Sequence, residues 1–472
     1  MYKIKFGTDG WRDIIAEHFT NENVRRVAYA TAEWLNISEL PKKIVLGHDC
    51  RFGGSMFANE AAVVFASHGI DVVMAKDFVS TPMISLAAKR LNVGLGIIIT
   101  ASHNPPSYNG FKIKAAYGGP ATPITIDEIE TLIPDLAITP EYNFEHFAST
   151  GRINFADFES MYLEHCKNSF DMNVLNSVGK NLVYDAMYGA GRNVIPQLLK
   201  DATVLNGGNN PGFEGRAPEP ILKNLPELAS LIPTSDSYKF GLATDGDADR
   251  IGFFDEKGRF VDSHHLILLL IEYLTDYKGY SGKVVKSFSV SDKVSKLCEI
   301  KGLETITTKI GFKYICEHMV TDDVLIGAEE SGGIAIKGHI PERDGIWMGL
   351  VLMEYAAKTG KSISQLIDDV YAKVGSFAVE RYDLHLNNEL KLTIIEDCKS
   401  NNYINFGVYN IIRTENIDGF KFHLEDGSWV MIRPSGTEPV LRVYAESHNS
   451  ENAFNILNAT KEQILNVGST QS

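Results

Sequence analysis

Cysteine is scarce in this 472-residue chain, and the residues that occur do not cluster. There is no CxxC pair, and the five cysteines are Cys50, Cys166, Cys298, Cys316 and Cys398. Disulfide frameworks use an even number of cysteines, and zinc sites need closely spaced thiol or imidazole ligands. We therefore expect reduced thiols and a cytoplasmic protein, without a disulfide-stapled fold or a zinc site.

Long apolar runs are missing as well. The longest, around His265–Tyr273, is interrupted by Glu272, whereas a membrane span needs about 20 apolar residues. The opening residues, MYKIKFGTDG, hold no apolar segment of the kind that directs secretion. A membrane partner is therefore not expected.

Basic residues are outnumbered by acidic ones, 45 Lys and Arg against 60 Asp and Glu, for a formal net charge of −15. Nucleic-acid backbones attract basic surfaces, so the composition excludes general nucleic-acid binding. A phosphorylated small molecule stays compatible with this charge, because it needs only a local positive pocket. The oligomeric state is expected to be monomer or dimer.

The length and the apolar pattern predict several domains. At about 150 residues per domain, the chain holds three or four. Three segments show the order strand, polar turn, helix that is typical of α/β units: Lys43–Gly69, Asn181–Asp201 and Lys283–Lys301. After about Ser376, short strands and a final helix predict an α+β domain with an antiparallel sheet. The predicted domains, three α/β with mixed, largely parallel sheets and one α+β, span residues 1–150, 151–257, 258–375 and 376–472.

The first chemical motif is TASHNPPSYNGFK, Thr100–Lys112, which follows the apolar strand Gly94–Ile99. Ligands bind at the carboxyl ends of strands in open α/β sheets, and Ser102 stands in such a place, beside His103. A serine held there is a candidate nucleophile or phosphate carrier, and an Asn-Gly turn directs Lys112 back toward it. Taken alone, the motif proves nothing, because an isolated Ser-His pair is more often part of an ordinary serine turn.

The second motif is TDGDADR, Thr244–Arg250, again after an apolar strand. Asp245, Asp247 and Asp249 alternate in an extended loop and project to one side, which indicates a hard-oxygen site suited to Mg²⁺. An EF-hand is disfavoured, because Arg250 stands where its loop requires glycine. A solvated acidic turn is the other alternative, but three close carboxylates repel one another unless a cation lies among them.

A third motif, GAEESGG at Gly327–Gly333, follows the strand Val324–Ile326. Glu329 and Ser331 can exchange hydrogen bonds with sugar hydroxyls, while the glycines permit close approach. By itself this is a flexible glycine-rich loop, and carboxylates beside glycine are common in turns.

The fourth motif is RPSGTEP, Arg433–Pro439, between two predicted strands of the tail. Arg433, Ser435, Gly436 and Thr437 offer a guanidinium, two hydroxyls and backbone amides, the parts of a phosphate site. A Pro-Ser-Gly turn without any ligand is the alternative.

Together these motifs resemble the α-D-phosphohexomutase superfamily, which includes phosphoglucomutases and phosphomannomutases. The likeness runs from FGTDGWR (Phe6–Arg12) through TASHNP, DGDADR and GAEESGG to RPSGTEP, in the family's order and spacing, and covers essentially the whole chain. The resemblance implies four domains around a central cleft, three of related α/β topology and a fourth with an antiparallel sheet.

The resemblance also implies roles for single residues. Ser102 would be the phosphoserine, and with Asp245, Asp247 and Asp249 it would hold Mg²⁺. Lys112 would assist proton transfer, with Arg12, Arg250 and His103 as the other catalytic residues. The residues expected to bind the phosphosugar are Gly311, Phe312, Lys313, Glu329, Ser331, His339, Asp344, Arg433, Ser435, Gly436 and Thr437.

The implied reaction interconverts hexose 1-phosphate and hexose 6-phosphate through a 1,6-bisphosphate, with glucose 1,6-bisphosphate as activator. Glucose is favoured because Gly333 replaces a histidine found in many phosphomannomutase and phosphoglucosamine mutase relatives. Phosphomannomutase and phosphopentomutase activity remain alternatives, as do a phosphatase and a non-catalytic sugar-phosphate sensor. For Lys112 to accept a proton, neighbouring cations would have to lower its pKa.

Overall fold

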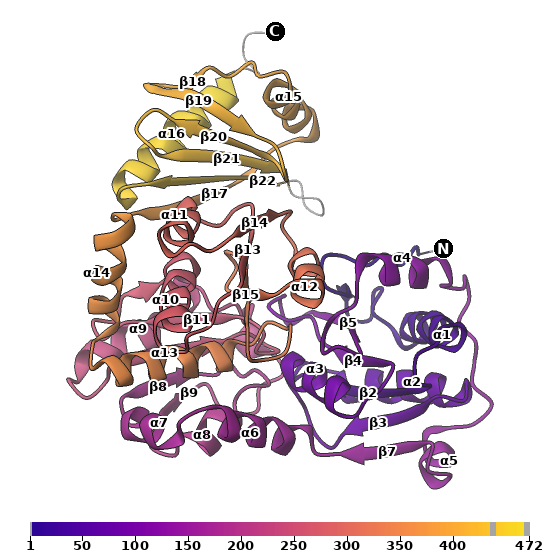
Figure 1. The fold of residues 1–472 in the computed structure, drawn as a ribbon. Coiled ribbons are helices and arrows are strands. Elements are labelled where there is room, and N and C mark those ends of the chain that lie inside the picture. The colour runs from indigo at the N-terminus through magenta and orange to yellow at the C-terminus, as the bar shows by residue number, and fades with distance from the viewer. Residues whose placement is uncertain (1, 435–439, 467–472) are drawn as a thin grey trace. The chain divides into compact units, whose positions relative to one another are not determined.

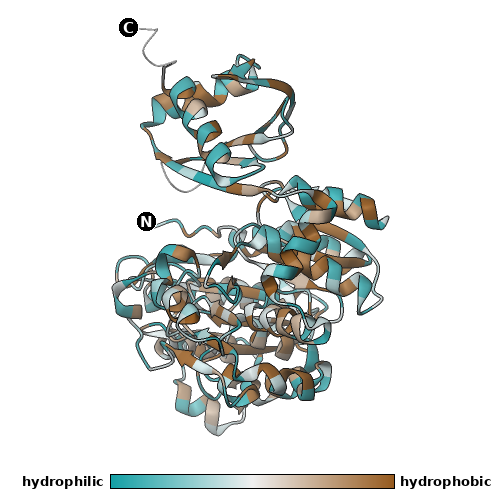
Figure 2. Cartoon of the chain, turned by 90° about the vertical axis from the view of Figure 1, so that its left-hand side faces the viewer, coloured by the Kyte–Doolittle hydropathy of each residue, from teal (hydrophilic) through white to brown (hydrophobic). Residues whose placement is uncertain are grey.

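The computed structural model describes residues 2–434 and 440–466. These residues fall into two compact units, Met1–Val285 with Gly311–Ile367, and Lys286–Ile310 with Asp368–Ser472. In Figure 2 the helices carry both polar and apolar residues, as amphipathic helices do when one face packs on a sheet. Within the described residues, no helix is both long enough and apolar enough to cross a membrane.

The first sheet has seven strands, in the order β1-β5-β4-β2-β3-β7, with β6 beside β5 (Figure 1). Parallel pairing links β4, β2, β3 and β7, while β5 runs antiparallel to β1, β4 and β6. The strands are β1 (Trp11–Ile14), β2 (Lys43–His48), β3 (Asp71–Ala75), β4 (Leu95–Ile99), β5 (Tyr108–Ala115), β6 (Gly119–Pro120) and β7 (Ile153–Ala156). The boundary predicted at residue 150 thus falls before a strand that completes this sheet.

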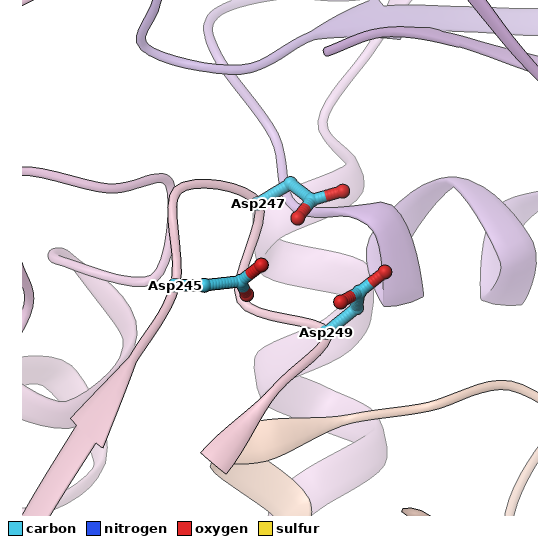
Figure 3. A group of neighbouring side chains, drawn as sticks. All are labelled: Asp245, Asp247 and Asp249. Carbon is cyan, nitrogen blue, oxygen red and sulfur yellow. The ribbon is translucent and has the colours of Figure 1, made fainter. Parts of the chain in front are cut away.

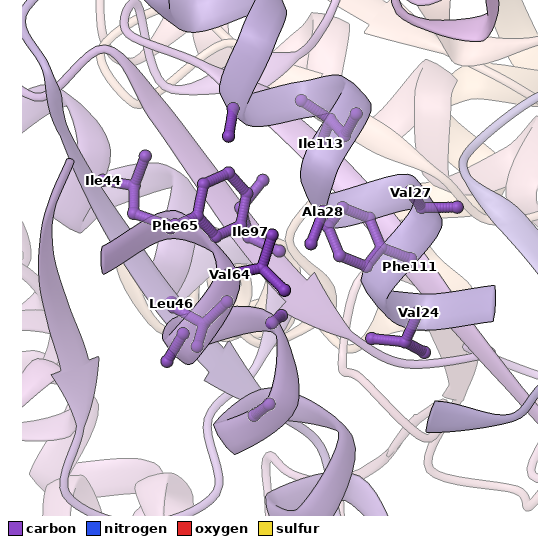
Figure 4. Close-up of a cluster of buried hydrophobic side chains, with 14 of the residues drawn as sticks. Val24, Val27, Ala28, Ile44, Leu46, Val64, Phe65, Ile97, Phe111 and Ile113 are labelled. Atoms are coloured by element: carbon purple, nitrogen blue, oxygen red, sulfur yellow. The ribbon is translucent and has the colours of Figure 1, made fainter. Parts of the chain in front are cut away.

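Five helices accompany the first sheet: α1 (Asn21–Ile37), α2 (Gly54–Ser67), α3 (Thr81–Arg90), α4 (Pro123–Thr131) and α5 (Phe144–Ser149). Helix α3 begins where it does because the Ser80 side chain accepts the Met83 amide and Pro82 stands in the first turn. The apolar faces of α1 and α2 bury Val27 and Phe65 against strand residues such as Ile97 (Figure 4). This core supports the strand ends that carry the first motif.

The second sheet has the order β12-β11-β10-β8-β9, with β8 parallel to β9 and β10 and the other pairs antiparallel. Its strands are β8 (Leu182–Asp185), β9 (Thr203–Leu205), β10 (Phe240–Thr244), β11 (Ile251–Phe254) and β12 (Phe260–Val261). The helices are α6 (Phe158–Ser169), α7 (Met172–Gly179), α8 (Val194–Leu198) and α9 (Pro226–Leu231), with 3₁₀ turns at Phe213–Gly215, Leu222–Asn224 and Ile232–Thr234.

The third sheet has the order β14-β13-β15-β16, with β15 antiparallel to β16. Its strands are β13 (Lys283–Ser287), β14 (Thr305–Thr308), β15 (Val324–Ala328) and β16 (Ile334–Ile336). The helices of this region are α10 (Ser263–Asp276), α11 (Asp292–Lys301), α12 (Phe312–Thr321), α13 (Gly345–Thr359) and α14 (Ile363–Val374).

The fourth sheet is antiparallel, in the order β17-β22-β21-β20-β19-β18. Its strands are β17 (Ala378–His385), β18 (Asn405–Phe406), β19 (Tyr409–Glu415), β20 (Phe420–Leu424), β21 (Trp429–Pro434) and β22 (Val440–Ser447), and its helices are α15 (Asn388–Lys399) and α16 (Ser450–Asn466). The predicted fold class, three mixed α/β sheets and an antiparallel C-terminal sheet, is confirmed.

Candidate active site

Ser102 lies in the loop after β4, where its backbone is strained and its side chain is buried. Its φ is +52°, in the left-handed region that a residue with a side chain rarely adopts, and only 1% of its surface is exposed. The Thr100 hydroxyl accepts the Ser102 amide at 2.9 Å. The Ser102 hydroxyl in turn donates to Oδ2 of Asp245 at 2.6 Å, and Nδ1 of His103 lies 3.4 Å from the Ser102 hydroxyl oxygen. The structure thus brings the predicted nucleophile onto the predicted metal loop.

Arg51, which the sequence did not single out, fixes the shape of the Ser102 loop. Its Nη1 donates to the carbonyls of Pro105 at 2.9 Å and Tyr108 at 3.2 Å. Its Nη2 donates to the carbonyls of Asn104, at 2.6 Å, and Ser102. A single buried guanidinium therefore satisfies four backbone acceptors of the loop that carries the nucleophile.

Three aspartates project from the β10–β11 loop toward a common space (Figure 3). One oxygen each of Asp245, Asp247 and Asp249 lies within 4.8 Å of the others, and all three residues are buried. Gly246 permits the approach to Ser102, since a Cβ at this position would lie 2.5 Å from the serine carbonyl oxygen.

The carboxylate chemistry fits a divalent cation. Among the described residues, no hydrogen-bond partner reaches Oδ1 of Asp247 or Oδ1 of Asp249, although both atoms are buried. Burial, followed by the charges of Asp247 and Asp249, raises the pKa of Asp245 well above its usual range. Unpartnered buried oxygens and repelling carboxylates are what a bound Mg²⁺ would resolve, so these residues fit the metal that the resemblance implies.

Lys112 reaches the aspartates from β5. Its ammonium lies 2.7 Å from Asp247 Oδ2, 3.0 Å from Asp249 Oδ2 and 2.8 Å from Asp9 Oδ2, and the side chain is fully buried. Burial alone would lower the pKa of Lys112, but these carboxylates outweigh it and raise that pKa above the usual value. The sequence-based expectation of a lowered pKa is therefore wrong for this arrangement, because the charges nearest to the ammonium are anionic.

The two predicted arginines and His103 lie around the same cluster. Arg12 donates to Oδ1 of Asn104 at 2.8 Å, and the amide of Arg250 donates to Oδ1 of Asp245 at 3.1 Å. Burial, and then the nearby cations, Arg250 foremost, hold the pKa of His103 well below its ordinary value, so its imidazole is neutral near pH 7. The structure thus places Arg12 at the Ser102 loop and a neutral imidazole beside the Ser102 hydroxyl.

Asp9 and Arg343 are site residues that the sequence reasoning missed. Asp9 stands inside the motif FGTDGWR and Arg343 in the segment GHIPERDG, Gly338–Gly345, but neither sequence shows what its charged residue contacts. Arg343 Nη2 pairs with Asp9 and lies 2.8 Å from Oδ2 of Asp249. A second buried pair, Lys114 and Glu342 at 2.8 Å, lies beside them.

Glu329 stands at the end of β15, in the predicted sugar-recognition loop. Its Oε1 accepts the amide of Gly311 at 3.0 Å, which joins the loop to the Gly311–Lys313 segment. Burial raises the pKa of Glu329 to about 7, against an opposing effect of Arg343. Phe312 is buried under the Arg343 guanidinium, 5.2 Å from ring centre to Cζ, whereas Lys313 and Ser331 are half-buried.

His339 and Asp344 lie in a different network, in which both of their side chains are fully buried. Nε2 of His339 is 3.0 Å from Oδ2 of Asp344, the hydroxyl of Tyr162 donates to that oxygen at 2.7 Å, and Nδ1 of His339 is 3.1 Å from Nε2 of His165. Trp347 stacks on the His339 ring at 3.8 Å. Their contacts join α6 to the start of α13, so the structure gives them packing partners rather than an open face toward a sugar.

The predicted phosphate site lies partly outside the described residues. Arg433, at the end of β21, places its Nε 3.3 Å from Oδ2 of Asp418. Ser435, Gly436 and Thr437 lie outside the described ranges 2–434 and 440–466.

Comparisons with known proteins agree with this geometry. The chain matches the phosphoglucomutase/phosphomannomutase family in four consecutive parts, described as alpha/beta/alpha domains I, II and III and the C-terminal domain. They cover residues 3–137, 160–258, 262–374 and 390–463.

Similar proteins match along nearly their whole length. A phosphoglucomutase/phosphomannomutase of Thermococcus kodakarensis is 29% identical over 453 residues, 95% of each chain. A phosphoglucosamine mutase of Methanocaldococcus jannaschii is 30% identical over 448 residues, 92% of this chain and 93% of its own. The crystal structure of a Thermus thermophilus protein assigned as a phosphomannomutase superposes with a TM-score of 0.86 at 32% identity, covering 98% of this chain and 99% of that one. With its matching domains and its serine, aspartate and lysine cluster, the chain belongs to the phosphoglucomutase/phosphomannomutase family and is an enzyme of the mutase type, an intramolecular phosphotransferase.

Proposed function

We propose that this enzyme interconverts hexose 1-phosphates and hexose 6-phosphates, with glucose as the main sugar and Ser102 as the carrier of the transferred phosphoryl group. The observation that carries the proposal is the buried hydrogen bond of 2.6 Å from the Ser102 hydroxyl to Asp245. A serine used only to form a turn has no need for a carboxylate cluster with two unpartnered oxygens beside it.

The transfer moves one phosphoryl group between two oxygens. The bond between phosphorus and Ser102 Oγ breaks, a bond to the free sugar hydroxyl forms, and the proton of that hydroxyl is passed on so that the serine oxygen leaves as a hydroxyl. In the second half of the reaction the bisphosphate returns its other phosphoryl group to Ser102. Charge neutralisation and in-line positioning dominate such transfers, and the cations Arg250 and Arg12 lie near enough to His103, the residue after the serine, to lower its pKa.

Asp245, Asp247 and Asp249 are the residues that would hold Mg²⁺. When bound, Mg²⁺ supplies a Lewis acid that neutralises phosphoryl oxygens. Lys112 is in its acid form in this arrangement, which suits donation of a proton to a sugar oxygen. His103 presents a neutral imidazole 3.4 Å from Ser102 Oγ, within reach of the proton that leaves the reacting hydroxyl.

The phosphate that does not react needs its own site, because the bisphosphate must turn end for end between the two halves. The predicted residues for this site are Arg433, Ser435, Gly436 and Thr437. A second phosphate site favours a mutase over a phosphatase, since hydrolysis does not require the product to be held and turned.

Glucose is proposed on the GAEESGG form of the sugar loop. The relatives include a phosphoglucosamine mutase and a phosphoglucomutase/phosphomannomutase, so mannose and glucosamine phosphates belong in the same test. Glucose 1,6-bisphosphate is the proposed activator, and the five free cysteines, all buried, fit the proposed cytoplasmic location. A monomer or dimer is the proposed assembly.

The test is a set of coupled assays with glucose 1-phosphate, mannose 1-phosphate and glucosamine 1-phosphate, each with Mg²⁺ and a trace of the matching bisphosphate. Glucose 1-phosphate is expected to give the highest kcat/KM, and omission of Mg²⁺ is expected to abolish turnover. A higher kcat/KM for another sugar would overturn the glucose assignment. Release of inorganic phosphate without isomerised product would overturn the mutase assignment in favour of a phosphatase.

A further inference from the structure

Gly333 and Arg343 are packed so closely that the first makes room for the second. A Cβ at position 333 would lie 2.6 Å from Cδ of Arg343 and 3.2 Å from its Cγ. Gly333 has no positive φ, so its backbone does not require glycine. The arginine stem, rather than local conformation, is what excludes a side chain at this position.

Arg343 cannot simply move aside, because its far end is anchored. The guanidinium Nη2 pairs with Asp9 and lies 2.8 Å from Oδ2 of Asp249, and the side chain is only 5% exposed. The guanidinium also covers the ring of Phe312 at 5.2 Å. A displaced stem would withdraw the guanidinium from both carboxylates.

We propose that Arg343 is a positioning residue for phosphoryl transfer, that it orients Asp249 for the metal and Asp9 for Lys112, and that Gly333 is the residue that admits it. This inference rests on the proposed function, because it concerns how two carboxylates of the same site are positioned. It links the sugar loop, which carries Gly333, to the metal loop through one side chain.

The orientation of the Asp249 and Asp9 carboxylates follows from which of their oxygens contact a cation. Arg343 and Lys112 both contact Oδ2 of Asp249, and Oδ1 is left without a hydrogen bond. Asp9 is shared in the same way, since its Oδ2 receives both the guanidinium and the Lys112 ammonium. A planar guanidinium holds two carboxylates in fixed directions, whereas a lysine ammonium acts as a point charge.

The pairing also gives the glycine of GAEESGG a physical meaning. Position 333 holds no side chain here because the space belongs to the arginine of PERDG, which lies ten positions later in the sequence. A side chain at 333 and an arginine stem at 343 therefore exclude each other in this backbone. Gly333, which stands where many relatives carry a histidine, is thus linked to Arg343: the residue type at one position restricts the residue type at the other.

The first experiment is a double-mutant cycle. Gly333→Ala in the natural background forces the arginine stem to move, so kcat is expected to fall about 10- to 100-fold, the usual effect of losing a residue that orients a metal ligand. In an Arg343→Ala background the same glycine substitution meets no stem, and a further change below about 2-fold is expected. Gly208→Ala, where a Cβ meets nothing within 4 Å, is the matched control and should change kcat by less than about 2-fold.

The second experiment separates positioning from packing. Arg343→Lys and Arg343→Met keep a stem of similar bulk, but only lysine keeps the charge. We expect kcat to fall in the order arginine, lysine, methionine, with KM for the sugar phosphate changing less than kcat. Equal effects of lysine and methionine, or equal effects of Gly333→Ala in both backgrounds, would overturn the proposal.

Mg²⁺ binding, measured by calorimetry on the same variants without substrate, gives a readout that needs no turnover. Mg²⁺ is expected to bind Arg343→Met and Gly333→Ala about 10- to 100-fold more weakly than the natural enzyme. Tighter binding to Arg343→Met would show that the guanidinium competes with the cation and would overturn the proposal. If the natural enzyme turned over no sugar phosphate, the proposed function would fail. The comparison of Mg²⁺ binding among the variants would still decide this inference.

Discussion

Replacing Arg51 by methionine removes the one side chain that satisfies four carbonyls of the Ser102 loop. The residue is buried, and its Nε also lies 3.4 Å from Oδ2 of Asp49. Each hydrogen bond from a charged donor contributes about 1.5–3 kcal/mol, but the loop can relax and regain part of this from water. Breaking a buried charged network usually costs about 3–5 kcal/mol, and we expect a loss of that size in the free energy of unfolding.

Activity should fall with stability. A nucleophile displaced by about 1 Å can lose about 100-fold in rate, so kcat of Arg51→Met is expected to drop by about that factor at temperatures where the variant is folded. Arg51→Lys keeps the charge but presents three donors on one nitrogen, which cannot reproduce the planar fork that reaches four carbonyls. It is expected to recover only part of both losses.

The assay is denaturant unfolding, followed by the fluorescence of Trp11, Trp34 and Trp347 in the first unit, together with steady-state kinetics. Arg152→Met is the control, because Arg152 is 42% exposed and its pair with Asp71 is a surface ion pair worth at most about 1 kcal/mol. If Arg51→Met unfolded within about 0.5 kcal/mol of the natural protein and kept its kcat, the idea that this guanidinium holds the loop would be refuted.

Three further predictions concern single side chains. The folded-state pKa of Glu329 is about 7 and its usual value 4.5, so the folded protein binds this proton more tightly, and stability should fall by at most about 3 kcal/mol as pH rises from 4.5 to 7. Glu329→Gln should remove that slope in unfolding curves at pH 5 and 7.5, and an unchanged slope would contradict the assignment. Gly246→Ala should cut kcat by about 100-fold, unlike Gly208→Ala, because its Cβ would lie 2.5 Å from the backbone oxygen of the nucleophile; equal kinetics for the two would refute this. Lys114→Met leaves the buried carboxylate of Glu342 without its closest cation and should lower the free energy of unfolding by about 3–5 kcal/mol, whereas a change below about 1 kcal/mol would show that the pair is dispensable.

The strands and the loops that follow them could be predicted from the sequence because both depend on local patterns. The apolar runs before the serine, aspartate and glutamate motifs became β4, β10 and β15, and the ends of β4 and β15 lie within two residues of those expected. The short strand Ile153–Ala156 was not expected, since two of its four side chains are exposed and its apolar pattern is weak. It is a strand because it pairs with β3, which no local pattern reveals.

The contacts within the site could not be predicted, because they join residues far apart in the chain. Arg51 reaches a carbonyl 51 positions later, and Arg343 reaches Asp9 across 334 positions. The prediction of a lowered pKa for Lys112 was wrong for the same reason, since that pKa is raised in the structure. The resemblance placed the cations Arg12 and Arg250 near Lys112, whereas the fold places three carboxylates nearest to its ammonium.

The most direct test of the account is the phosphorylation of Ser102 by substrate. The protein is incubated with glucose 1,6-bisphosphate and Mg²⁺, and its mass and phosphorylated peptide are determined beside Ser102→Ala and Ser107→Ala, the latter an exposed serine of the same loop. One phosphoryl group per chain is expected on Ser102 in the natural and Ser107→Ala proteins, and none in Ser102→Ala. Full turnover by Ser102→Ala, or a phosphoryl group on another residue, would contradict it.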